Sequence, residues 1–215
     1  MVLNTFIDHT LLKANATVDH IKQLCAEAKE HHFYAVCVNS YYVALAESEL
    51  MKTDIKIAAV VGFPLGATIT KAKVYEAKQC IKNGAHEIDL VLNIGLLKSG
   101  YHKIVEEEIK AVKKEIGEHI LKVIFENCYL TDEEKRIACQ LSLNAGADFI
   151  KTSTGFGTGG ATPEDIVLMK NEVHGSTIKI KASGGIRDLK TATQYIELGV
   201  DRIGTSAGVT IVTSK

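Results

Sequence analysis

The stretch GADFIKTSTGFGTGG, residues 146–160, decides the fold because it joins three features within a few residues. Gly146 ends an amphipathic segment, residues 148–152 form a short apolar run typical of a buried strand, and a glycine-rich loop follows. Lys151 lies inside the apolar run, although burying an unpaired ammonium is unfavourable. The stretch therefore predicts a buried strand that delivers a reactive amine to the edge of a loop.

Comparable apolar runs recur along the chain and alternate with amphipathic segments. Most of them are rich in Val and Ile and lack strict alternation of polar and apolar residues, which is typical of parallel strands covered by helices. The predicted strands span residues 5–9, 35–39, 57–62, 87–92, 121–126, 148–152, 178–182 and 202–204.

The segments between these strands have helical periodicity and recognisable ends. Thr17 is an expected N-cap, the TDEE that begins at Thr131 resembles a capping box, and Pro163 stands in a first turn. Predicted helices span residues 17–31, 41–51, 70–83, 101–116, 131–144 and 189–198, and another opens at 162–165. Eight strands separated by helices predict an α/β fold, a closed (β/α)8 TIM barrel in a single domain over residues 1–215. An open doubly wound sheet is the alternative.

Composition excludes several classes of protein. The formal net charge is −1, so no basic surface indicates nucleic acid or an anionic membrane as a partner. Apolar runs are too short to span a bilayer, and the N-terminus has no signal-peptide pattern. The 5 cysteines lack CxxC spacing, and no HExxH or HxH motif occurs. We therefore expect a cytoplasmic protein with no metal and no cofactor.

Polar residues inside the apolar strands indicate where the chemistry lies. In a parallel barrel alternate residues face the lumen, and strand C-terminal ends face the active-site mouth. Asp89 alternates with Ile88 and Leu90, so it should point inward. The same rule directs Lys151 and Lys181 to the lumen. Three more residues should lie nearby: Asp8, Thr10 and Cys37.

Two lysines and an aspartate in one cavity fit imine chemistry. A neutral amine adds to a carbonyl, and a second ammonium with partial desolvation lowers the pKa of the first. Asp89 can then move protons as the carbinolamine forms and collapses. A buried ion pair that only fixes packing is the structural alternative.

Glycine-rich turns follow the last two strands and predict a phosphate site. One is Ser183-Gly184-Gly185-Ile186, and the other runs from Gly204 to Gly208. Barrels frequently bind phosphate in the loops after strands seven and eight, where glycines let backbone N–H groups approach the ligand.

Seven stretches in order along the chain resemble the deoxyribose-phosphate aldolase family of class I aldolases. They are IDHTLL (7–12), AVCVNSYYV (35–43), VVGFPLGA (60–67), EIDLVLNIG (87–95), DFIKTSTGF (148–156), IKASGGIRD (180–188) and RIGTSAG (202–208). The resemblance implies reversible, metal-independent cleavage of 2-deoxy-D-ribose 5-phosphate to D-glyceraldehyde 3-phosphate and acetaldehyde, in deoxyribonucleoside catabolism. Small phosphorylated sugars and aldehydes would be its partners.

The resemblance also implies roles for individual residues. Lys151 would form the Schiff base, Lys181 would perturb its pKa and exchange protons, and Asp89 would be a proton donor and acceptor. Asp8 and Thr10 would contact the site and its proton relay, with Cys37 nearby. The residues implied for substrate hydroxyls and phosphate are Thr154, Gly184, Gly185, Gly204, Thr205 and Ser206.

The chain departs from the family pattern in places. Phe156 stands where some members carry a lysine, so we expect one cationic contact to the phosphate to be missing. The sequence also lacks the tail with a functional tyrosine that some members carry. FENC at 125–128 is a variant of a fifth-strand signature that leaves the role of Asn127 open.

Alternative functions are another sugar-phosphate barrel enzyme, either an isomerase or a different Schiff-base lyase, and a non-catalytic sugar-phosphate-binding protein. We expect a homodimer or homotetramer only because barrels of this type often self-associate.

Overall fold

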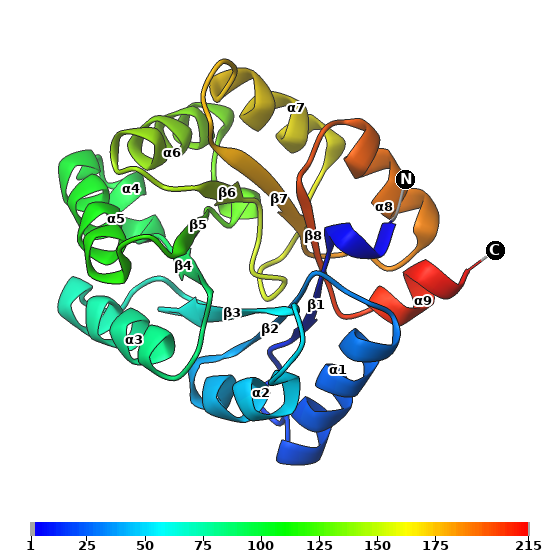
Figure 1. The fold of residues 1–215 in the computed structure, drawn as a ribbon. Helices are drawn as coiled ribbons and strands as arrows, with labels where there is room; N and C mark the ends of the chain where they lie inside the picture. The colour runs from blue at the N-terminus through cyan, green and yellow to red at the C-terminus, as the bar shows by residue number, and fades with distance from the viewer. Residues whose placement is uncertain (1–2, 215) are drawn as a thin grey trace.

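The computed structural model of the chain describes residues 3–214 and confirms the predicted barrel. Eight parallel strands close in the order of the sequence, and β8 pairs with β1. Figure 1 shows the strands gathered in the middle with the helices around them. The strands are β1 Ile7–Leu11, β2 Ala35–Asn39, β3 Lys56–Val61, β4 Glu87–Val91, β5 Ile120–Ile124, β6 Phe149–Lys151, β7 Lys179–Ser183 and β8 Arg202–Thr205.

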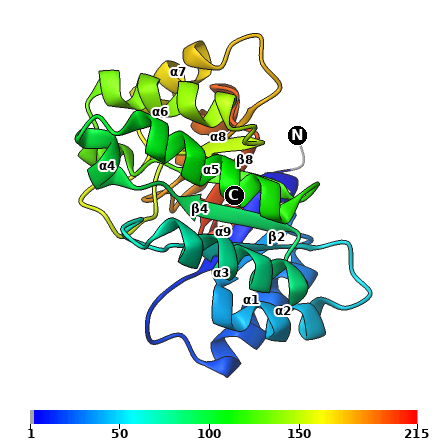
Figure 2. The same ribbon diagram turned by 90° about the vertical axis from the view of Figure 1, so that its left-hand side faces the viewer.

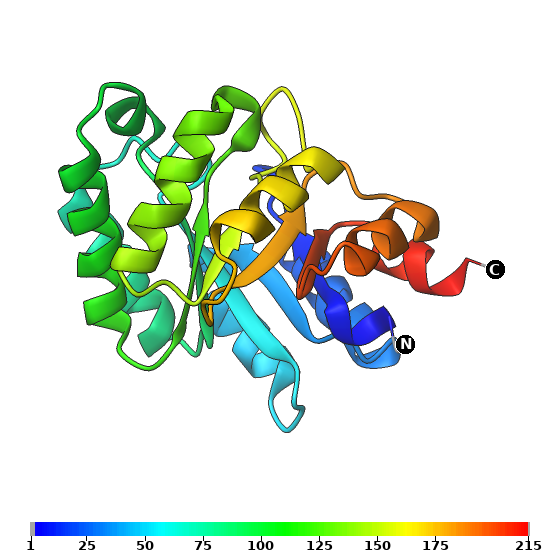
Figure 3. The ribbon, with the colours of Figure 1, turned by 90° about the horizontal axis from the view of Figure 1, so that it is seen from above.

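The helices form an outer layer, which Figures 2 and 3 show from two further sides. Figure 1 also shows both ends of the chain on the same side of the barrel, near α8 and α9. No helix among residues 3–214 is long and apolar enough to span a membrane. The helices are α1 Val18–Glu30, α2 Val43–Leu50, α3 Thr70–Lys82, α4 Ile94–Lys98, α5 His102–Ile116, α6 Asp132–Asn144, α7 Pro163–Glu172, α8 Leu189–Glu197 and α9 Gly208–Thr213.

Local chemistry explains where several helices begin. Thr17 and Thr131 both form capping boxes. Each threonine side chain accepts from the backbone N–H of the third helical residue, and the side chain of that third residue accepts from the backbone N–H of the threonine. Thr162 caps α7, and Pro163 is its first residue. The N-cap residues recognisable in the sequence therefore coincide with helix starts in the structure.

Two strand ends and two short helices differ from the sequence prediction for identifiable reasons. The first strand starts at Ile7 because Leu3–Phe6 form a 3-10 helix. The fifth ends at Ile124, since Glu126 adopts a left-handed backbone that cannot continue a strand. Helices α4 and α9 were missed because they have only 5 and 6 residues, too few to show a helical period.

The barrel has an apolar layer outside its strands and a divided lumen inside. Outward-facing strand residues pack against the helices in one large buried cluster. Inside the barrel, a separate small cluster of apolar residues fills one side: Leu12, Cys37, Ala58 and Val60. Charged side chains occupy the other side, so the lumen provides a low-dielectric setting for a few polar groups.

A buried ion pair links α3 to α5 away from the lumen, and sequence reasoning did not identify it. Lys73 is fully buried; its Nζ lies 2.5 Å from an oxygen of Glu108 and donates to the Val91 carbonyl at 3.0 Å. Thr70 donates its hydroxyl to the other Glu108 oxygen at 3.0 Å. A lysine on a helix is ordinarily solvated, so burial of Lys73 depends on tertiary packing.

We expect Glu108→Gln to lower the free energy of unfolding by about 3 kcal/mol, because it leaves the Lys73 ammonium buried without a counter-charge. Urea denaturation followed by circular dichroism measures this change. Glu107→Gln is the matched control, since Glu107 is 65% exposed in its side chain and pairs only at 4.0 Å with Lys103. Equal stability of the two variants would contradict the role assigned to the pair.

Candidate active site

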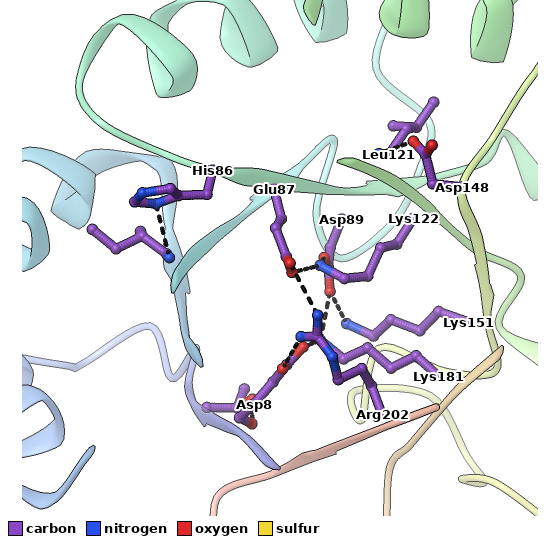
Figure 4. A network of polar contacts seen from close by, with 12 residues as sticks. Asp8, His86, Glu87, Asp89, Leu121, Lys122, Asp148, Lys151, Lys181 and Arg202 are labelled. Carbon is purple, nitrogen blue, oxygen red and sulfur yellow. Dashed lines mark hydrogen bonds and ion pairs between the residues drawn. The ribbon is translucent and has the colours of Figure 1, made fainter. Parts of the chain in front are cut away.

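Seven charged side chains from six strands converge in the lumen (Figure 4). Each is almost completely buried, with no more than 5% of the residue exposed. Ion pairs connect all of them into one network. They are Asp8 on β1, Glu87 and Asp89 on β4, Lys122 on β5, Lys151 on β6, Lys181 on β7 and Arg202 on β8.

Strand register brings these side chains together. Asp89 pairs in register with Lys122 across β4 and β5, and Lys151 pairs with Lys181 across β6 and β7. Residues in register on neighbouring strands point to the same side of a sheet. The inward orientation derived for Asp89 from alternation therefore extends around the barrel.

Asp89 lies at the centre of the network. Its Oδ1 accepts from Lys122 Nζ at 2.7 Å, and its Oδ2 lies 2.7 Å from Lys151 Nζ and 3.0 Å from Lys181 Nζ. In Figure 4 the Lys151 and Lys181 side chains both extend toward this carboxylate. The two amines thus share one oxygen atom, which places them at the same level and on the same side of the lumen.

A second layer of the network supports the first. Lys181 Nζ lies 2.5 Å from Asp8, whose other oxygen accepts from Arg202 at 2.8 Å. Arg202 also binds Glu87 at 3.1 Å, and Glu87 in turn pairs with Lys122 at 2.5 Å. These contacts close a ring of alternating charge around Asp89, and they hold each carboxylate in one orientation.

The network holds three carboxylates and four cations, so one positive charge is unbalanced when all are ionised. Burial disfavours the charged form of every lysine. For Lys181, burial is outweighed by the attraction of Asp8 and Asp89, which raises its pKa. For Lys151, burial and the repulsion of Lys181 outweigh the attraction of Asp89 and lower its pKa. Lys151 is therefore the cation that most readily becomes a neutral amine.

Both aspartates stay ionised at neutral pH. Burial alone would raise the pKa of Asp8, but Lys181 and Arg202 bring it to about 2. Burial also acts on Asp89, but the three lysines around it overcome this effect and hold its pKa well below the usual range. The charges of the two aspartates keep Lys181 protonated and leave Lys151 as the group that titrates.

A cavity of about 360 Å³ opens beside Lys151. It is lined by Thr10, Thr154 and Phe156, together with residues 183–187 at the end of and after β7 and 204–206 in and after β8. Loops at the C-terminal ends of the strands thus build the cavity, as in barrel enzymes generally. The residues predicted for substrate and phosphate all border it.

The glycines near the cavity have different roles. Gly184 and Gly185 have φ of +85° and +79°, a left-handed conformation that strongly favours glycine. A Cβ atom at Gly204 would lie 2.9 Å from Lys181 Cε, so this glycine leaves room for the lysine stem. The Thr205 hydroxyl donates to the Ile186 carbonyl at 2.7 Å, which ties the two loops together.

Thr10 and Cys37 occupy opposite settings. Thr10 lines the cavity and donates its hydroxyl to the carbonyl of Asp8 at 2.8 Å, so it stiffens the end of β1. Cys37 is fully buried in the small apolar cluster of the lumen. Burial raises the pKa of its thiol, which keeps it protonated and poorly nucleophilic.

Several residues of the site were not identified from the sequence. Lys122 and Arg202 carry charge within apolar strands, which is the same signal that indicated Lys151. Lys13 and Arg187 line the cavity from loops and had no periodic signal. Among residues 3–214, no cluster of His, Cys, Asp and Glu has the arrangement of a metal site.

The two residues where the chain departs from the family pattern lie in different surroundings. Phe156 lines the cavity and packs edge-on against Phe63, with ring centroids 5.2 Å apart. Asn127 is buried, and its side-chain nitrogen contacts the Met169 sulfur at 3.5 Å. The cavity wall at Phe156 is therefore aromatic, and Asn127 does not border the cavity.

Comparisons with known proteins agree on one group. Residues 3–212 match the family described as DeoC/LacD family aldolase. The deoxyribose-phosphate aldolases of Brevibacillus brevis and Clostridium tetani are each 54% identical over 213 residues, covering 99% of this chain and 96% and 98% of those proteins. A solved structure described as a tetrameric deoxyribose phosphate aldolase from Aeropyrum pernix has a TM-score of 0.90 and is 31% identical, over 98% of this chain and 89% of that one.

Proposed function

Because the chain belongs to the DeoC/LacD family of aldolases, we propose that it cleaves 2-deoxy-D-ribose 5-phosphate to D-glyceraldehyde 3-phosphate and acetaldehyde through a Schiff base on Lys151. The observation that carries the proposal is the buried Lys151 amine, which has a lowered pKa and shares an oxygen of Asp89 with Lys181. Relatives named deoxyribose-phosphate aldolase support the choice of substrate.

Imine formation begins when the neutral Lys151 amine attacks the aldehyde carbon of the open-chain sugar. Asp89 carries a proton from the nitrogen of this first adduct to its alkoxide oxygen, which gives the carbinolamine. The adjacent Lys181 ammonium then donates a proton to the hydroxyl group, which leaves as water and yields the protonated imine. Asp89 suits this role because it already binds both amines. Asp8 holds Lys181 in place as this proton moves.

Cleavage follows because the protonated imine withdraws electrons. The proton of the C3 hydroxyl passes, directly or through water, to Lys181, which imine formation has left as a neutral amine. The C2–C3 bond breaks, and its electron pair forms an enamine on Lys151. D-Glyceraldehyde 3-phosphate leaves. Protonation of the enamine carbon and addition of water then release acetaldehyde and restore the amine. Every proton returns to the Asp89–Lys181 pair or to water, so the cycle needs no external acid.

Phosphate is proposed to bind between the Gly184-Gly185 turn and residues 204–206. Left-handed glycines expose backbone N–H groups there, and Lys13 and Arg187 border the same cavity as cations. These two side chains would compensate for the absence of a cation at Phe156. The homo-oligomer and the cytoplasmic setting remain predictions; the tetrameric relative from Aeropyrum pernix supports the first.

Borohydride reduction in the presence of acetaldehyde tests the proposal. We expect the reduced imine to leave an ethyl group on the Lys151 Nζ, which peptide mass mapping locates, and activity to be lost in proportion. Omission of acetaldehyde should leave the peptide unmodified and the activity intact. Ethylation of another lysine in step with inactivation would assign the Schiff base elsewhere and contradict the role of Lys151.

A further inference from the structure

Glu126 occupies an unusual position beside Lys151. It lies just after β5, has a left-handed backbone (φ 57°, ψ 63°) and is only 2% exposed. The backbone N–H groups of its two neighbours bond to the end of β6 and to the residue that follows β6. Phe125 donates to the Lys151 carbonyl and Asn127 donates to the Thr152 carbonyl, both at 3.0 Å. A strained, buried acid in this place is typical of a functional site.

Both oxygens of the Glu126 carboxylate bind Thr154. Oε1 accepts from the Thr154 backbone N–H at 3.1 Å, and Oε2 accepts from the Thr154 hydroxyl. The loop continues across the acid, since a Cβ atom at Gly157 would lie 3.0 Å from the Glu126 carboxyl carbon. Glu126 therefore fixes both the backbone and the side chain of Thr154.

The bonds of the Thr154 hydroxyl determine what it can offer the cavity. A hydroxyl has one hydrogen to donate and two lone pairs that accept. Its hydrogen goes to Glu126, and one lone pair accepts from the Phe156 N–H at 3.0 Å. Because Thr154 lines the cavity with 7% of its surface exposed, the second lone pair is what remains for a ligand.

The ionised form of Glu126 fits this arrangement. Burial raises the pKa of Glu126 above its usual value, and the two bonds from Thr154 and the charge of Lys151 offset only part of that rise. A carboxylate without a proton accepts both bonds at once, whereas a donor in the same place would fill the second lone pair of Thr154.

We propose that Glu126 is a positioning residue that makes the Thr154 hydroxyl an acceptor toward the substrate, so the cavity selects a substrate that presents a hydroxyl donor there. The proposal rests on the proposed aldolase function. Both hydroxyls of open-chain 2-deoxyribose 5-phosphate lie on the piece that leaves as glyceraldehyde 3-phosphate. Thr154 would therefore act on bond cleavage and leave imine chemistry of acetaldehyde untouched.

Glu126→Gln tests the inference because the amide NH2 would donate to the Thr154 hydroxyl, which in the wild-type protein donates to the Glu126 carboxylate. We expect kcat/KM for cleavage to fall about tenfold, the loss from one misdirected hydrogen bond. Exchange of acetaldehyde methyl protons with D2O, which needs the imine and no substrate hydroxyl, should continue at the wild-type rate. Glu133→Gln on the exposed face of α6 is the matched control and should change neither rate.

Thr154→Val provides a second route to the same answer when Glu126→Gln does not fold. It should also lower cleavage and spare exchange. Where Glu126→Gln does fold, the double variant should show little further loss, since the two residues act as one unit. A parallel fall of cleavage and exchange in both variants would overturn the inference and leave Glu126 a merely structural group. Absence of exchange in the wild-type protein would instead refute the proposed aldolase function.

Discussion

Lys151→Arg is expected to lower kcat for aldol cleavage by roughly 10⁴-fold, because a guanidinium does not lose its proton and cannot add to an aldehyde. The positive charge and much of the volume remain, so the bond to Asp89 has a substitute. A continuous assay of released glyceraldehyde 3-phosphate measures the loss. Borohydride with acetaldehyde should then leave no ethyl group at residue 151.

The control for this variant is Lys179→Arg. Lys179 begins β7 at the exposed floor of the barrel, 5.8 Å from the Phe149 ring, and does not border the cavity. It should retain wild-type activity. An isomerase that uses the lysines only as electrostatic clamps would keep substantial turnover in the Lys151→Arg variant, so a loss of less than about tenfold would favour that alternative.

Lys181→Met is expected to lower kcat/KM at neutral pH by roughly hundredfold, through the charge balance of the lumen. Without Lys181, three carboxylates face three cations, and Lys151 must stay an ammonium to complete the balance. The pKa of Lys151 should therefore rise. Since the neutral amine is the nucleophile, activity appears only as the pH rises through that pKa.

The pH profile separates this effect from simple loss of an acid. In the wild-type protein the lowered pKa of Lys151 makes the neutral amine available at lower pH, so the acid limb of kcat/KM lies below that of an ordinary lysine. In Lys181→Met the limb should move to higher pH, with partial recovery of activity in alkaline buffer. A uniform fall without displacement of the limb would show that Lys181 supplies a proton and does not tune Lys151.

Alternation along strands predicted much of the fold and part of the site. Asp89 could be placed in the lumen because an aspartate between Ile88 and Leu90 has no other stable direction. Lys151 and Lys181 followed by the same rule, and parallel strands then required the carboxyl ends to meet. The direction of a strand side chain can be predicted in this way when the residues before and after it are apolar and must face the helices.

Residues whose surroundings come from distant segments could not be derived in this way. Lys73 is an ordinary helical lysine by its neighbours in sequence, and only the approach of α5 with Glu108 buries it. Glu126 was included in a predicted strand, because nothing in its composition announces a left-handed backbone. Tertiary packing sets both environments, and local patterns do not contain it.

The aromatic pair at the mouth of the barrel has a practical consequence for protein engineering. Phe156 lines the cavity and its ring packs against that of Phe63, and neither residue belongs to the charge network of the lumen. A mutant library confined to these two positions would vary the shape of the entrance while the amines and carboxylates below keep their balance. Acceptance of bulkier or unphosphorylated aldehydes could thus be selected independently of the bond-making machinery.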